Sequence, residues 1–164
     1  MTKEDRKIVR DRMRYTKNKL SSTLAIAAIV FNVFYFVSIY KSDVGTYYYQ
    51  ILVGADIVYN LLFMLIAFLS SEGVKNYKMS YSFVLLIIGA LQVGRIFLIP
   101  MRAHEATITI SDVTSQVMSD KQFMWVVAWL ALSALCCVLA AITSFCRNCA
   151  LASHMRALRK EKAA

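Results

Sequence analysis

The chain has 164 residues, of which 59% are hydrophobic, and its formal net charge is +9 at pH 7. Its mean hydropathy is +0.53, which is more apolar surface than one small water-soluble domain can bury. The composition therefore excludes an ordinary soluble domain and predicts a protein that lies in lipid.

Four apolar segments are long enough to cross a membrane as helices. A hydrocarbon core about 30 Å thick takes about 20 helical residues at ~1.5 Å each. We predict an all-α membrane protein, a four-helix transmembrane bundle that forms a single domain over residues 1–164. The predicted spans are residues 21–40, 49–70, 80–100 and 123–146.

The segment before the first span is strongly basic. Apolar Ile8, Val9 and Met13 are interleaved with its charges, which favours an amphipathic helix lying on an anionic membrane surface. Alternatively, the basic residues of this segment serve only to set the orientation of the chain in the membrane. The basic residues expected at this surface are Arg6, Lys7, Arg10, Arg14 and Lys17.

The distribution of charge predicts the orientation of the chain. Residues 1–20 carry eight basic and three acidic side chains, and residues 147–164 carry five and one. The segment 71–79 is also basic, whereas 41–48 is balanced and 101–122 is slightly acidic. Basic residues are retained on the cytoplasmic side. All three basic segments lie there only if the number of spans is even, so we predict that both termini are cytoplasmic.

Five polar residues within the spans predict a polar layer in the outer half of the bundle. Asp56 lies about two turns inside the second span, and Arg95 lies ~7 Å below the outer end of the third at ~1.5 Å per residue. Asn32, Asn60 and Gln92 lie at similar levels. An ionisable group at such a position is costly and is often functional. The layer is either a buried pair that fixes helix register or a binding site for a polar solute, an ion, a lipid head group or a partner peptide.

The outer connection and the small residues predict further contacts. Residues 107–111 alternate polar and apolar side chains, which suits a short strand, an extended lid or a flexible connector, and Pro100 lies where the third helix should stop. In the fourth span Ser133, Cys137 and Ala141 recur every four residues and form a packing face, directed either into the bundle or toward a partner. Ala90 and Gly94 show the same spacing in the third span.

After the fourth span, Leu151 and Met155 fall at helical spacing among basic residues. This pattern predicts a second amphipathic helix that continues the fourth span. Alternatively, its basic residues only set the orientation of the chain in the membrane. The basic residues expected at the membrane surface here are Arg156, Arg159 and Lys160.

No set of residues predicts catalysis or metal binding. Cys146 and Cys149 have the spacing of a metal knuckle, but with His154 they offer three ligands where structural zinc takes four. His104 and His154 are expected on opposite sides of the membrane, so no shared general base is available. We expect a protein that is not an enzyme and that holds no metal or cofactor.

The stretch from Asn18-Lys-Leu-Ser-Ser-Thr-Leu24 through Ser70-Ser-Glu-Gly-Val-Lys-Asn76 is similar to small four-span membrane proteins of anaerobic Gram-positive bacteria, a group without assigned function. The resemblance implies a bacterial plasma membrane and carries no functional residue.

Two functional hypotheses follow. The first is a non-catalytic accessory or structural subunit of a larger membrane complex such as a transporter, with lipid, anionic lipids of the inner face and other subunits or further copies as partners. The second is a small oligomeric transporter or channel that uses Asp56 and Arg95. Nucleic acid is not an expected partner, because no aromatic or glycine-rich platform accompanies the charge.

Overall fold

The computed structural model describes residues 17–40, 47–105, 107–110 and 113–163. Its elements in chain order are α2 (Lys19–Ile39), α3 (Tyr47–Lys75), α4 (Met79–Leu98), α5 (Pro100–Glu105), β1 (Thr107–Ile110), β2 (Val113–Gln116) and α6 (Asp120–Ala163).

Four of these helices are long and apolar enough to cross a membrane, so the predicted number of apolar spans is confirmed. α2 and α4 match their predicted limits closely, whereas α3 continues to Lys75 and α6 to Ala163, past the predicted ends at 70 and 146. Hydropathy detects only the apolar part of a helix, but backbone hydrogen bonding continues through polar residues that favour a helix.

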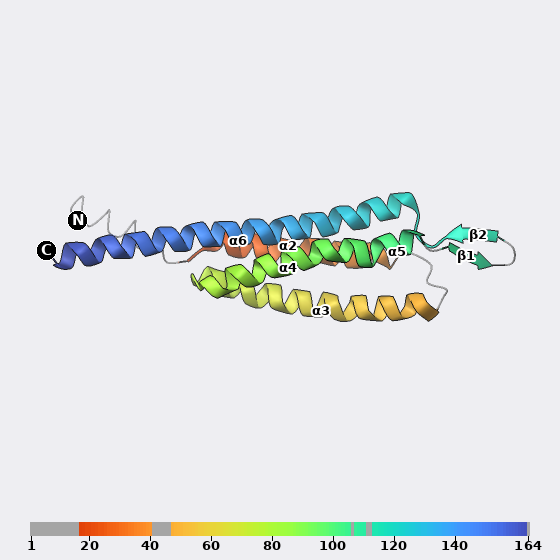
Figure 1. Cartoon of the computed structure of the whole chain (residues 1–164), viewed down its shortest axis with the longest axis horizontal. Helices are drawn as coiled ribbons and strands as arrows, with labels where there is room; N and C mark the ends of the chain where they lie inside the picture. The colour runs from red at the N-terminus through yellow and green to blue at the C-terminus, as the bar shows by residue number, and fades with distance from the viewer. Residues whose placement is uncertain (1–16, 41–46, 106, 111–112, 164) are drawn as a thin grey trace.

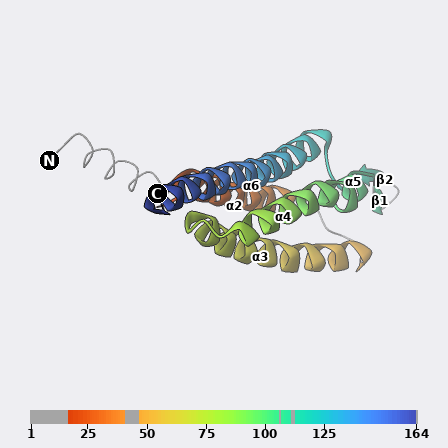
Figure 2. The ribbon, with the colours of Figure 1, turned by 60° about the vertical axis from the view of Figure 1, so that its left-hand side comes forward.

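The helices form an elongated bundle in which α6 and α3 lie on opposite sides. α6 packs along α2 and α4, and α3 packs against α2 and α4 on the side away from α6 (Figure 1). The rotated view in Figure 2 shows the same order. The last turns of α6 extend beyond the ends of the other three long helices (Figure 1). Residues on α2, α3 and α4 can therefore meet in a layer that α6 covers.

The two ends of the bundle differ. At the end that we call the hairpin end, α4 stops at Leu98, Pro100 begins α5, and β1 pairs with β2 in antiparallel register from Thr107 opposite Gln116 to Ile110 opposite Val113 (Figures 1 and 2). The extended segment predicted at 107–111 thus forms a strand, and its partner β2 was not predicted. The opposite end, which we call the tail end, holds the start of α2, the α3–α4 turn and the projecting part of α6.

The turn at the tail end holds α3 and α4 antiparallel. The Tyr77 amide donates to the Val74 carbonyl at 3.2 Å, and the Lys78 amide donates to the Gly73 carbonyl at 3.1 Å, which closes the end of α3. Gly73 also lies against the ring of Tyr81 and leaves no room for a side chain. The short turn makes α3 and α4 neighbours along their length.

The buried apolar side chains form two clusters, one in each half of the bundle. The tail-end cluster includes Ala25, Phe63, Leu85 and Ala140, which come from all four long helices. The hairpin-end cluster is built from Tyr35, Ile39, Ala103, Val117, Met118, Val126 and Leu130. A level between the two clusters on α2, α3 and α4 is occupied by polar side chains.

Small residues bring α6 close to its neighbours. The face of Ser133, Cys137 and Ala141 is buried, so it is directed into the bundle. A Cβ at Gly89 on α4 would lie 3.2 Å from the Cβ of Cys137 and 3.3 Å from a Val138 methyl group. The close approach therefore uses Gly89, whereas the Ala90 and Gly94 positions lie on the exposed face of α4.

Candidate functional site

The structure brings together the five residues of the predicted polar layer. Asp56 on α3 lies beside Arg95 on α4, and their side chains are 2% and 3% exposed. Arg95 Nε donates to Asp56 Oδ1 at 2.9 Å, and Nη2 donates to the same oxygen. The two opposite charges are therefore removed from solvent as a hydrogen-bonded pair.

Three amide side chains extend this pair into a closed ring. Asn32 Oδ1 on α2 accepts from Gln92 Nε2 at 3.0 Å and from Arg95 Nη1 at 3.3 Å. Asn32 Nδ2 donates to Asn60 Oδ1 at 2.9 Å. Asn60 Nδ2 donates to Asp56 Oδ2 at 3.3 Å, which returns the ring to the carboxylate. Each of the three helices that meet here contributes to the ring.

Two tyrosines complete the layer. The Tyr35 hydroxyl donates to both carboxylate oxygens of Asp56, at 3.0 and 3.1 Å. The Arg95 guanidinium carbon lies 4.3 Å from the centre of the Tyr35 ring and 4.6 Å from that of Tyr59. Such cation–π contacts stabilise a guanidinium most strongly when water is excluded. The arginine is thus held by a carboxylate, by amide oxygens and by two aromatic faces.

The layer is sealed as well as hydrogen-bonded. Only Asn18 Nδ2 and Ser70 Oγ lack a partner among the buried side-chain nitrogen and oxygen atoms of the described residues, and neither belongs to the layer. The apolar clusters lie above and below it, and the two pockets described at the bundle surface are lined by none of its residues. In this arrangement Asp56 and Arg95 neutralise each other and have no open face toward a solute.

A second set of polar contacts, made by serines, lies in the half of the bundle nearer the tail end. The hydroxyls of Ser82 and Ser144 lie 2.7 Å apart and join α4 to α6, and those of Ser22 and Ser71 lie 2.8 Å apart and join α2 to α3. Ser133 Oγ donates to the Ala28 carbonyl at 2.9 Å. Of these serines, only Ser133 was predicted to lie on a packing face. Serine is common in apolar helices, and only its spacing with other small residues could have pointed to the contacts.

The predicted membrane-surface residues are only partly covered by the structure. Lys17 and Arg156 are exposed at the tail end. Arg6, Lys7, Arg10 and Arg14 lie outside the described residues. Arg159 and Lys160 belong to the helical end of α6, but their side chains are not described. The continuous helix that was predicted beyond the fourth span is present.

Cys146 and Cys149 are exposed, Cys137 is buried and Cys136 is partly buried, and all four thiols are free. In the described part of the chain, no three His, Cys, Asp or Glu side chains gather closely enough to hold a metal ion.

Comparisons with protein-family models, with curated proteins and with solved structures found no match to this chain. The fold and the polar layer together define its class. It is a helical protein with four helices long and apolar enough to cross a membrane, and the buried Asp56–Arg95 pair, together with its hydrogen bond to Asn32, joins three of them.

Proposed function

We propose that this chain is a non-catalytic structural or accessory subunit of a larger membrane complex, with a transporter as the expected complex. The observation that carries the proposal is the closure of the polar layer. Asp56 and Arg95 are hydrogen-bonded to each other and to neighbouring amides, and both are almost fully buried. A carboxylate that carried an ion or a proton would need an open path to water, whereas a sealed pair suits a rigid scaffold.

The exposed apolar side of α3 supports a role in assembly. This helix contacts two neighbours but lies away from α6, the longest helix of the bundle. Large apolar side chains cover its outer face, namely Val58, Leu61, Leu62, Leu65, Phe68 and Leu69. In a membrane this face meets either lipid or a helix of another subunit. We propose that it meets a partner helix.

The proposal includes an orientation. The described part of the tail end carries Lys17, Lys75 and Arg156, and the sequence is basic toward both of its ends. We propose that this end lies in the cytoplasm of a bacterial plasma membrane, where it contacts anionic lipids of the inner face. The α6 extension would then reach a cytoplasmic part of the same complex.

Purification in a mild detergent from the native host tests this function. We expect one or more partner proteins to purify with the chain in a fixed stoichiometry.

A photo-crosslinking residue at Leu65 on α3 should link to the same partner, and one at Leu86 on the exposed side of α4 serves as the matched control. A clean monomer or homodimer that transports a solute in liposomes would instead support a small transporter and would contradict the proposal.

A further inference from the structure

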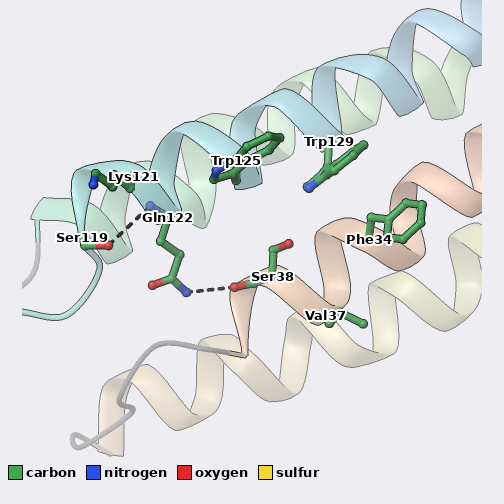
Figure 3. A pocket seen from close by; sticks show the side chains of 8 residues that line it. All are labelled: Phe34, Val37, Ser38, Ser119, Lys121, Gln122, Trp125 and Trp129. Atoms are coloured by element: carbon green, nitrogen blue, oxygen red, sulfur yellow. Dashed lines mark hydrogen bonds between the residues drawn. The ribbon is translucent and has the colours of Figure 1, made fainter.

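A pocket of about 610 Å³ lies between α2 and α6 at the hairpin end of the bundle. It is separate from the polar layer, since its walls belong to other faces of α2 and α6. Figure 3 shows the side chains around it. Its described lining residues are Phe34, Val37, Ser38, Ser119, Lys121, Gln122, Trp125 and Trp129.

One wall of the pocket is apolar and aromatic. The ring centres of Phe34 and Trp129 lie 5.0 Å apart across the two helices, and those of Trp125 and Trp129 lie 5.9 Å apart along α6. Phe34, Val37 and Trp125 are all exposed at the surface of the bundle. The pocket therefore opens sideways, toward the space that lipid would fill around the helices.

The floor of the pocket is polar and fixed. Gln122 Nε2 donates to the Ser38 carbonyl at 2.9 Å, which joins the end of α2 to the start of α6. The Ser38 hydroxyl and the Trp129 indole nitrogen are turned toward the same space (Figure 3). Neither indole N–H has a hydrogen-bond acceptor among the described residues. The pocket thus presents donors that a ligand with acceptor oxygens would satisfy.

Lys121 supplies the charge of the pocket. It is exposed, and within the described residues it has no ion pair, whereas the neighbouring Asp120 binds His104 at 2.9 Å. Eight residues separate Lys121 from Trp129, which places them about 12 Å apart along the helix at ~1.5 Å per residue. That distance exceeds the roughly 5–8 Å thickness of one polar interface of a bilayer. The pocket therefore extends from the head-group level into the hydrocarbon region.

We propose that this pocket binds one molecule of an anionic phospholipid. Its phosphate contacts Lys121, its ester carbonyl oxygens accept hydrogen bonds near Ser38 and Trp129, and one acyl chain lies along Phe34 and Val37. A free phosphate ion would leave the aromatic wall unused, a lipid with an uncharged head group would leave Lys121 without a counter-charge, and a zwitterionic lipid would bring its own cationic group near Lys121. The proposal requires only that the chain resides in a bilayer, so it stands apart from the proposed role as a subunit.

The tryptophans provide a direct test, because the chain has two and both line the pocket. The full chain is reconstituted in phosphatidylcholine vesicles, and brominated phosphatidylglycerol is added in increasing mole fraction, in parallel with brominated phosphatidylcholine. We expect half-maximal quenching of tryptophan fluorescence at a several-fold lower mole fraction of the anionic lipid. The Lys121→Gln variant should lose this preference, and Lys78→Gln, which removes an exposed charge at the tail end, should keep it.

Equal quenching by the two lipids in the unchanged protein would overturn the proposal. So would a Lys121→Gln variant that keeps the preference, or competition by millimolar glycerol 3-phosphate, which would indicate a site for the head group alone. Circular dichroism checks that each variant keeps its helical content. Co-purification of partner proteins is measured separately, so failure of the lipid site and failure of the subunit role are distinguishable.

Discussion

Each charge of the Asp56–Arg95 pair would cost several kcal/mol to bury alone, and the attraction between them offsets that cost only with good geometry. The hydrogen-bonded ring provides such geometry, because Asp56 also accepts from Asn60 and Tyr35 and Arg95 Nη1 donates to Asn32 and Gln92. Loss of one partner would leave the other charged and buried. We therefore expect the pair to fix the register of α3 against α4 more than to add net stability.

We expect Asp56→Ala and Arg95→Ala each to lower the free energy of unfolding by about 3–5 kcal/mol, the usual cost of an unpaired buried charge. The exchanged pair, Asp56→Arg with Arg95→Asp, should recover most of this loss, since asparagine and glutamine can reverse their donors and acceptors. Unfolding by sodium dodecyl sulfate in detergent micelles, followed by circular dichroism, measures the effect. Leu91→Ala on the exposed face of α4 is the matched control.

The exchanged pair also separates the two roles that the sequence left open. Recovery of both folding and partner binding would support a structural pair. A protein that folds normally but has lost its activity would identify the layer as a binding site and would contradict the structural role. Single variants that remain as stable as the parent would show that the ion pair is not needed for the bundle.

The turn between α3 and α4 contains the one residue other than glycine that has positive φ in the described part of the chain. Tyr77 has φ of +58° at the second residue after the end of α3, where glycine is usual. A Cβ in this conformation costs roughly 1–2 kcal/mol. Tyr77→Gly should therefore raise the free energy of unfolding, by about 0.5–1 kcal/mol after the greater freedom of glycine in the unfolded chain is included.

The control for this prediction is Tyr77→Ala, which removes the ring but keeps the Cβ. Detergent unfolding should rank glycine above alanine at this position. Equal stability of the two variants would mean that the backbone conformation stores no strain. A glycine variant less stable than the parent would mean that the contacts of the tyrosine ring stabilise the fold by more than the strained backbone destabilises it.

Patterns along a single helix predicted the spans and the depth of their polar residues, but not the contacts that depend on how two elements pack. The four spans and the matched depths of Asp56 and Arg95 followed from hydropathy and helical rise, since both depend on position along one helix. The Ser82–Ser144 contact depends on how two helices rotate about their axes, and no single-helix pattern contains that angle. β2 was missed because it is short and pairs only with a neighbouring strand, so it has little pattern of its own.

At the scale of the whole molecule, charge and apolar surface are arranged along one axis. The tail end carries the exposed Lys17, Lys78 and Arg156 and the α6 extension, whereas the hairpin end carries the tryptophan-lined pocket with Lys121. Tryptophan is enriched at membrane interfaces, and basic residues are enriched on the cytoplasmic side. The basic residues favour the proposed orientation, in which the tail end is inside the cell, whereas the tryptophans mark an interface on either side of the membrane.

The native cysteines test this orientation without any change to the chain. Cys146 and Cys149 are exposed on the part of α6 toward the tail end, whereas Cys137 is buried within the bundle. A charged maleimide that cannot cross membranes should label the protein only after the cells are permeabilised, because the labelled thiols face the cytoplasm. In a Cys146→Ser, Cys149→Ser background, Ser119→Cys at the exposed start of α6 should be labelled in intact cells. Labelling of the native cysteines in intact cells would show that the orientation is the opposite one. The basic ends would then lie outside the cell, and a partner there would have to account for them.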